Sequence, residues 1–176
     1  MALRINERPF QRRMYWPFDS GVGNWAEVHG TWVFARGSAQ CTVLDGAEGW
    51  LVNDFRSPDV RVDLTQRMPP SGTVAFGYLV RWEDEDNYWL WRITPGTAGT
   101  DFELVNYVGG APSVVASADV DWVASTEYEL IFTAVNREFT AYINGVEALY
   151  HYDFDLLFLT KTRHGIWTAD LVVKFQ

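Results

Sequence analysis

The 176-residue sequence has one cysteine, three scattered histidines and no long apolar run, and each shortage excludes a class of protein. Cys41 alone cannot form a disulfide within the chain, and its strand-like surroundings predict a small, buried apolar side chain. The absence of any run of about 18 apolar residues excludes a membrane-spanning helix. The first residues lack the apolar segment of a signal peptide, so we expect synthesis and folding in a reducing cytoplasm.

The motifs of common catalytic and metal sites are also missing. His29, His151 and His164 have no metal-ligand spacing. The sequence contains no P-loop, no C-x-x-C pair and no G-x-S-x-G turn. These absences predict a protein that is not an enzyme.

Charge is unevenly distributed along the chain, whose net value is −9. Residues 1–13 carry +3 and the remaining residues carry −12. An acidic body argues against nucleic acid as a partner, because phosphate binding needs a basic face. The basic segment predicts an arm that docks on an acidic neighbouring subunit, or alternatively a solvated terminus or an arm packed on its own domain. The arginines that would contact the partner are Arg4, Arg8, Arg12 and Arg13.

Strand-like patterns dominate the rest of the sequence. Residues 74–92 hold two apolar runs around the acidic segment 83–87, which predicts a hairpin between long central strands. Residues 60–65 and 128–134 alternate with a period of two, and in the second run the inward face is expected to carry Tyr128, Leu130, Phe132 and Ala134. Asn144-Gly145 is a strong two-residue hairpin signal. We therefore expect an arm over residues 1–14 and one all-β, two-sheet antiparallel sandwich over residues 15–176, with at most a short helical turn near 153–159.

Several segments resemble the concanavalin A-like lectin/glucanase jelly-roll superfamily, and most closely its laminin-G-like modules in bacterial and phage proteins. They are Phe18-Asp19, Asn24-Trp25, Gly30-Thr31-Trp32, the run 77–82, the run 86–89 and the hairpin 141–146. The resemblance covers about residues 15–175. It implies a jelly roll, but not one function, because the superfamily includes lectins, glycosidases, adhesion modules and viral structural domains.

The resemblance has consequences for catalysis and for metal binding. A retaining glucanase of this superfamily would carry an E-x-D-x-x-E strand, with carboxylates about 5 Å apart, and this pattern is absent. Glu83, Glu85 and their neighbours belong to the predicted turn instead. The position of calcium in relatives implies Asp19 and Asp170 as ligands; we favour ordinary turn or strand-end aspartates, and expect no cofactor.

Sugar binding would use exposed aromatic rings beside amide, carboxylate or guanidinium groups. The candidate residues are Trp50, Trp82, Asn87, Trp89, Trp91 and Arg92. Alternation places Trp89 and Trp91 on one face of their strand, opposite Tyr88 and Leu90, and leaves open which pair is buried.

We interpret the chain as a non-enzymatic structural or assembly protein of a phage particle, which docks on neighbouring subunits and is part of a homo-oligomer. Phage proteins reach the outside of the cell by lysis, so the missing signal peptide is consistent with a location in the virion. The alternative is a carbohydrate-binding module that contacts a cell-surface glycan, and a glycosidase is less favoured. We expect neither nucleic acid nor membrane as a partner.

Overall fold

The computed structural model describes residues 25–35, 38–70, 74–96, 101–171 and 173–175, which form fourteen strands and no helix. Within this part of the chain no helix is long and apolar enough to cross a membrane. The all-β prediction is therefore confirmed. The helical turn expected over 153–159 is wrong, because Leu156 and Phe158 have left-handed backbone (φ 57° and 56°) and the segment is a series of bends and turns.

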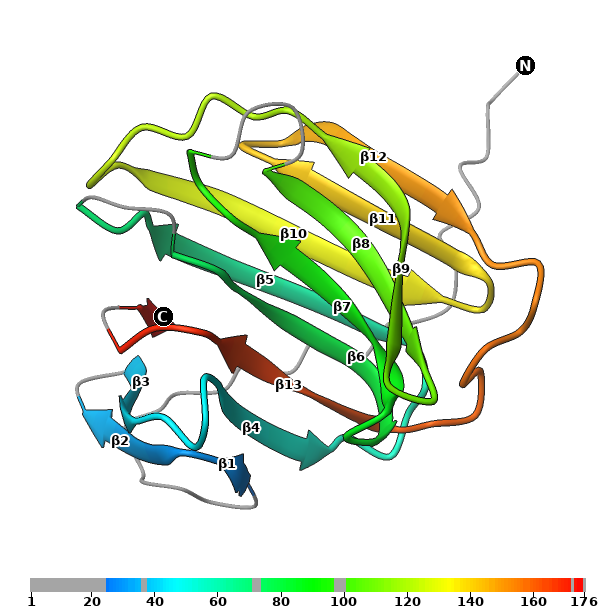
Figure 1. The fold of residues 1–176 in the computed structure, drawn as a ribbon. Helices are drawn as coiled ribbons and strands as arrows, with labels where there is room; N and C mark the ends of the chain where they lie inside the picture. Colours follow the sequence, from blue (N-terminus) through cyan, green and yellow to red (C-terminus); the bar gives the residue numbers. More distant parts are fainter. Residues whose placement is uncertain (1–24, 36–37, 71–73, 97–100, 172, 176) are drawn as a thin grey trace.

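Seven antiparallel strands form the larger layer, in the order β1-β4-β13-β6-β7-β8-β9 (Figure 1). They are β1 (Ala26–His29), β4 (Gly49–Asp54), β6 (Phe76–Asp84), β7 (Asn87–Ile93), β8 (Phe102–Val108), β9 (Ala111–Ala118) and β13 (Arg163–Thr168). The hairpin predicted over 74–92 is the pair β6–β7 at the centre of this sheet.

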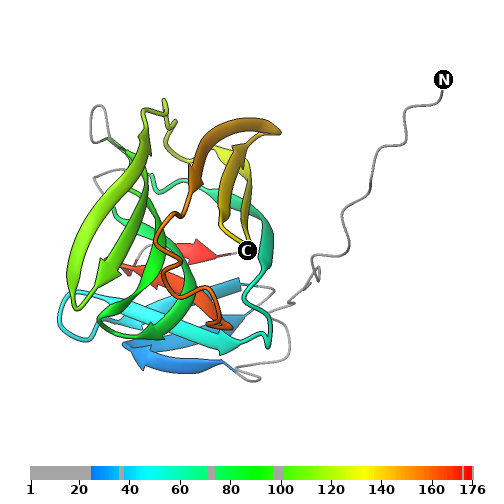
Figure 2. The same ribbon diagram turned by 90° about the vertical axis from the view of Figure 1, so that its right-hand side faces the viewer.

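The second layer is a four-stranded sheet, in the order β12-β11-β10-β5, extended by a three-stranded sheet, β14-β3-β2. Its strands are β2 (Thr31–Ala35), β3 (Ser38–Val43), β5 (Val60–Arg67), β10 (Glu127–Val135), β11 (Glu138–Ile143), β12 (Val146–Tyr152) and β14 (Lys174–Phe175). β14 contacts β5, and β12 contacts β9 at the opposite edge. Figure 2 shows the green strands of the first layer and the yellow to orange strands of the second layer on opposite sides of the molecule.

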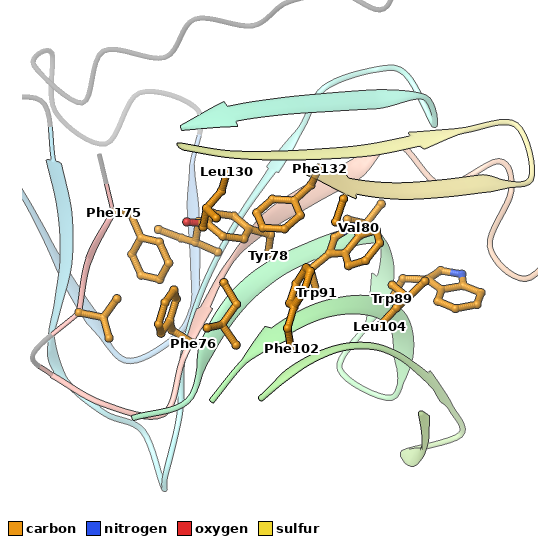
Figure 3. Close-up of a cluster of buried hydrophobic side chains, with 14 of the residues drawn as sticks. Phe76, Tyr78, Val80, Trp89, Trp91, Phe102, Leu104, Leu130, Phe132 and Phe175 are labelled. Carbon is orange, nitrogen blue, oxygen red and sulfur yellow. The ribbon is translucent and has the colours of Figure 1, made fainter. Parts of the chain in front are cut away.

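The main core lies between the two layers (Figure 3). Leu130, Phe132 and Ala134 of β10 are buried there, as their alternation predicted, and Cys41 is a buried apolar side chain. Trp91 of β7 stacks with Phe132 at 5.6 Å between ring centroids. Alternating residues of facing strands therefore fill the space between the sheets.

A second apolar cluster lies on the other face of the seven-stranded sheet, under a bent β6–β7 hairpin. Its members are Trp50, Val52, Leu79, Trp82, Tyr88, Leu90 and Trp167. The register of β6–β7 shifts between Val80 and Asp84, and Arg81 has a φ of 52°, which marks a bulge that bends the strand. Glu85 in the acidic turn consequently reaches His29 of the edge strand β1, with 3.4 Å between Oε2 and Nε2.

Candidate functional site

The two tryptophans of β7 that were candidates for sugar stacking belong to the main core. Trp89 and Trp91 are 1% and 0% exposed, and Trp89 donates a hydrogen bond from Nε1 to the carbonyl of Leu157. The face of β7 that carries them packs in the main core, and Tyr88 and Leu90 on the other face are buried in the second apolar cluster. The expectation that one of the two pairs is exposed is therefore wrong. Neither ring offers a surface to a ligand, so both leave the set of candidates.

Trp50 and Trp82 lie on the opposite face, in the second apolar cluster, and they are also largely covered. Trp50 contacts the rings of His29 and Tyr88 edge-on and donates from Nε1 to Glu48 at 2.6 Å. The guanidinium of Arg163 lies 5.2 Å from the ring of Trp82. These contacts explain why both rings pack against protein and expose little surface.

Asn87 and Arg92 are engaged in contacts within the protein. The side-chain amide of Asn87 donates to Asp84 and accepts from the backbone N–H of Gly109, so it joins two neighbouring turns. Arg92 donates from Nε and Nη2 to one oxygen of Glu103, at 2.8 and 2.6 Å. These hydrogen bonds within the protein account for the positions of both side chains without a ligand.

The remaining predicted site residues are not brought together by the described structure. Arg4, Arg8, Arg12, Arg13 and Asp19 lie outside the described residues. Asp170 is described, and its backbone N–H donates to the hydroxyl of Thr168 at 3.0 Å. Its role as a metal ligand stays a prediction. Among the described residues, no group of three or more His, Cys, Asp or Glu side chains is placed to hold a metal ion.

A hollow of about 510 Å³ lies instead on the outer face of the four-stranded sheet. Because Leu130, Phe132 and Ala134 point into the core, the residues between them on β10 point outward and form its floor. The floor consists of short, β-branched side chains from two strands, namely Ile131, Thr133, Val135 and Thr140. Its volume is within the usual range of about 300–1,000 Å³ for small-molecule sites.

Longer side chains surround this floor. Strand register aligns Tyr150 of β12, Thr140 of β11, Thr133 of β10 and Arg61 of β5 in one row across the sheet. The neighbouring row carries Glu147, Tyr142 and Ile131, and Glu138 lines the hollow on the other side. Half of the surface of Tyr150 is exposed. The hollow exists because short side chains occupy the middle of the sheet and long ones its rim.

Arg61 gives the rim a fixed polar group. Its Nε and Nη2 donate to both oxygens of Asp63, at 2.9 and 2.7 Å, in a forked ion pair. The hydrogen bond to Asp63 raises the pKa of Arg61 above its ordinary value, and Tyr142 adds a smaller contribution in the same direction. The donors on Nη1 are not used by this pair, so Arg61 can still donate to a ligand.

The set of groups in the hollow determines which ligands it suits. Tyr150 offers a flat apolar ring with a polar end, and Thr140 offers a hydroxyl that can donate and accept. The hydroxyl of Thr133 donates to the carbonyl of Thr140 at 3.4 Å and can still accept from a ligand. Arg61 donates, and the glutamates of the rim accept. A ligand with apolar C–H faces and many hydroxyls would match this mixture.

The sequence contained only a weak signal for this hollow. Ile131 and Thr133 were visible as the outward half of the alternation at 128–134, but short β-branched residues on an exposed strand face are common. The candidate tryptophans instead lie on β4, β6 and β7, where their rings are buried in the two apolar clusters.

Comparisons with known proteins show similarity of fold. No family model matches the chain, and no curated protein matches it. The carbohydrate-binding module CBM66 from Bacillus subtilis is 18% identical, with a TM-score of 0.68 over 87% of this chain and 92% of that chain. Sheep galectin-11 is 10% identical, with a TM-score of 0.51 over 66% and 84%. A proposed glycosyl hydrolase from Parabacteroides distasonis is 9% identical, with a TM-score of 0.56 over 86% and 87%.

At these identities the similarity establishes a lectin-type β-sandwich and no more. The expected sandwich is confirmed at that level, while membership of the concanavalin A-like superfamily stays a prediction. The comparisons offer nothing in favour of a phage particle, and they support the carbohydrate-binding alternative better than the virion interpretation.

Proposed function

We propose that this protein is a non-catalytic carbohydrate-binding module that binds glycan in the hollow over β5, β10, β11 and β12. One observation carries the proposal: a half-exposed tyrosine ring stands beside two threonine hydroxyls and a fixed guanidinium around a hollow of about 510 Å³. A sugar ring presents a C–H face for the ring of Tyr150 and hydroxyls for the polar groups. The names of two similar folds, a carbohydrate-binding module and a galectin, support the same class of ligand.

The carboxylates around the hollow support binding rather than hydrolysis. Glu138 pairs with Tyr152 and Tyr142 pairs with Glu147, so the two glutamates stand about four residues, or roughly 13 Å, apart along the strands. Glycosidase carboxylates stand about 5 Å apart in retaining enzymes and about 6.5–9.5 Å apart in inverting ones. Glu138 and Glu147 therefore line opposite ends of the hollow, and their backbone positions do not form such a pair.

The charge of the protein favours a neutral glycan. The chain carries −9 overall, and Asp63 compensates the charge of Arg61 at the rim. We expect oligogalacturonate to bind about tenfold more weakly than a neutral oligosaccharide of equal length at low salt, with the difference shrinking as added salt screens the repulsion. Titration calorimetry at two salt concentrations measures this. Tighter binding of the acidic oligosaccharide would contradict the assignment.

Substitution of Tyr150 tests the site itself. A glycan array and then calorimetry with cello-, xylo-, manno- and chito-oligosaccharides identify a ligand of the unmodified protein. Tyr150→Ala is expected to weaken binding of that ligand about tenfold or more, because it removes the exposed ring at the rim. Its melting temperature should change little, because Tyr150 is half exposed.

The matched control lies on the other sheet. Tyr107 of β8 stacks on Tyr88 at 4.4 Å between ring centroids, on the face of the seven-stranded sheet where the candidate tryptophan Trp50 lies. Tyr107→Ala should leave glycan affinity unchanged. Loss of binding in Tyr107→Ala with full binding in Tyr150→Ala would move the site to the seven-stranded sheet, and no binding to any glycan would refute the proposed function.

A further inference from the structure

An aromatic strip continues from the hollow along β12 and beyond its end. Tyr150 and Tyr152 are alternate residues of this strand and share a face, about 6.8 Å apart along the chain. Phe154 follows two residues later, and its ring centroid lies 4.9 Å from that of Tyr152. Three aromatic rings therefore succeed one another from the rim of the hollow outward.

Phe154 is unusually exposed for a phenylalanine, with 80% of its surface accessible. Apolar side chains of this size are normally buried, and an exposed one beside other rings marks a contact surface more often than an isolated one does. It has no polar atom, so it can offer a ligand only an apolar face.

The turn that presents Phe154 is fixed by the protein. The backbone N–H of the buried Asp153 donates to the carbonyl of Arg137 at 2.8 Å. One carboxylate oxygen of Asp153 accepts from the backbone N–H of Asp155 at 3.0 Å. The guanidinium of Arg137 also lies 6.0 Å from the ring of Tyr152. Because these contacts already fix the turn in the free protein, little conformational entropy is lost when a ligand binds to it.

We infer that Tyr152 and Phe154 form a second sugar subsite, and that the ligand is an extended, uncharged polysaccharide chain rather than a single terminal sugar. The inference rests on the proposed function of the hollow. A chain that places one residue over Tyr150 and runs along β12 would meet Phe154 with a later residue. Each ring can stack on the face of a sugar whatever the arrangement of its hydroxyls. This subsite should therefore raise the affinity for longer chains and have little effect on which sugar is preferred.

Chain-length dependence tests the subsite. Calorimetry is carried out with cello-, xylo-, manno- and chito-oligosaccharides of two to six residues, for the unmodified protein, Phe154→Ala and Tyr150→Ala. In the series that binds, affinity should rise with length. Phe154→Ala should weaken binding of the hexasaccharide about tenfold and of the disaccharide less than about twofold, whereas Tyr150→Ala should weaken both.

The outcomes separate this inference from the function on which it rests. If Tyr150→Ala weakens binding but Phe154→Ala changes no affinity at any length, the hollow binds glycan and the second subsite is wrong. If affinity does not rise with length, the extended ligand is wrong as well. If no oligosaccharide binds, both proposals fail. Sedimentation of the same proteins gives a further check, because a dimer that dissociates on Phe154→Ala, with glycan affinity unchanged, would assign the strip to a protein interface instead.

Discussion

The free energy of unfolding is expected to fall by about 3 kcal/mol between pH 7 and pH 4 through His164 alone. This side chain is 2% exposed. Its Nδ1 accepts from the backbone N–H of Arg81 at 3.3 Å, and its Nε2 lies 2.9 Å from the carbonyl of Ser57, an arrangement that suits the neutral imidazole. Burial is the main cause that lowers the pKa of His164 to about 4, from an ordinary value near 6.5.

The direction of the effect follows from the two pKa values. Above about pH 6.5 the imidazole is neutral in both the folded and the unfolded chain, and pH has no effect through this group. Between about pH 6.5 and 4 the unfolded chain binds the proton and the folded chain does not, so stability is lost as the pH falls. Below about pH 4 both states bind it and the loss through His164 ends.

Denaturant unfolding at several pH values, for the unmodified protein and for His164→Gln, measures this contribution. The amide of glutamine can still donate to Ser57 but does not titrate, so the stability difference between the two proteins should shrink as the pH falls from 6.5 to 4. Burial also lowers the pKa of His151. Its effect on stability is the same in both proteins and therefore does not change the difference between them. Asp54, whose pKa is lowered by its hydrogen bond from Thr162, acts at more acidic pH. A difference that stays constant with pH would show that His164 does not carry the effect.

Trp91→Ala is expected to destabilise the protein by about 3–5 kcal/mol, which corresponds to about 10 °C in melting temperature. The indole is fully buried and stacks with Phe102 and Phe132, so its removal loses buried apolar area and leaves a cavity between the two sheets. The wall of that cavity is made of paired strands, which cannot collapse into it without loss of hydrogen bonds. Thermal and denaturant unfolding measure the change.

Trp91→Phe is the matched control for this prediction. The Nε1 of Trp91 is buried and has no hydrogen-bond acceptor among the described residues, so its removal relieves an unpaired polar group. Phenylalanine also keeps most of the ring contacts. We expect a loss of only about 1–2 kcal/mol. A Trp91→Phe protein as unstable as Trp91→Ala would show that the indole nitrogen has a partner, and a stable Trp91→Ala protein would contradict the position of this ring in the core.

Local patterns in the sequence were sufficient for the class of fold and for several turns and faces. Asn144 and Gly145 have φ values of 50° and 78°, as a two-residue hairpin between β11 and β12 requires. The alternation at 128–134 correctly gave Leu130, Phe132 and Ala134 as core residues. These predictions succeeded because a turn dipeptide and a period of two depend on neighbours within a few residues.

Alternation states that successive residues lie on opposite faces of a strand, but it does not state which face meets the other sheet. For β7 both faces are apolar, because one packs in the main core and the other lies under the bent β6–β7 hairpin. The choice between Trp89 and Trp91 on one side and Tyr88 and Leu90 on the other was therefore decided by tertiary packing. The bend that covers the outer face comes from the bulge at Arg81, and the local sequence gave no sign of it.

The sequence by itself determined an antiparallel sandwich, its period-two faces and its tightest turn, because these follow from interactions between residues close along the chain. Only the tertiary structure decided the candidate site. Arg61 and Thr133 are far apart in sequence and become neighbours through the pairing of β5 with β10, while Tyr150 joins them through β11. The hollow is a property of that strand order, since pairing between distant strands depends on how the whole chain buries its apolar faces.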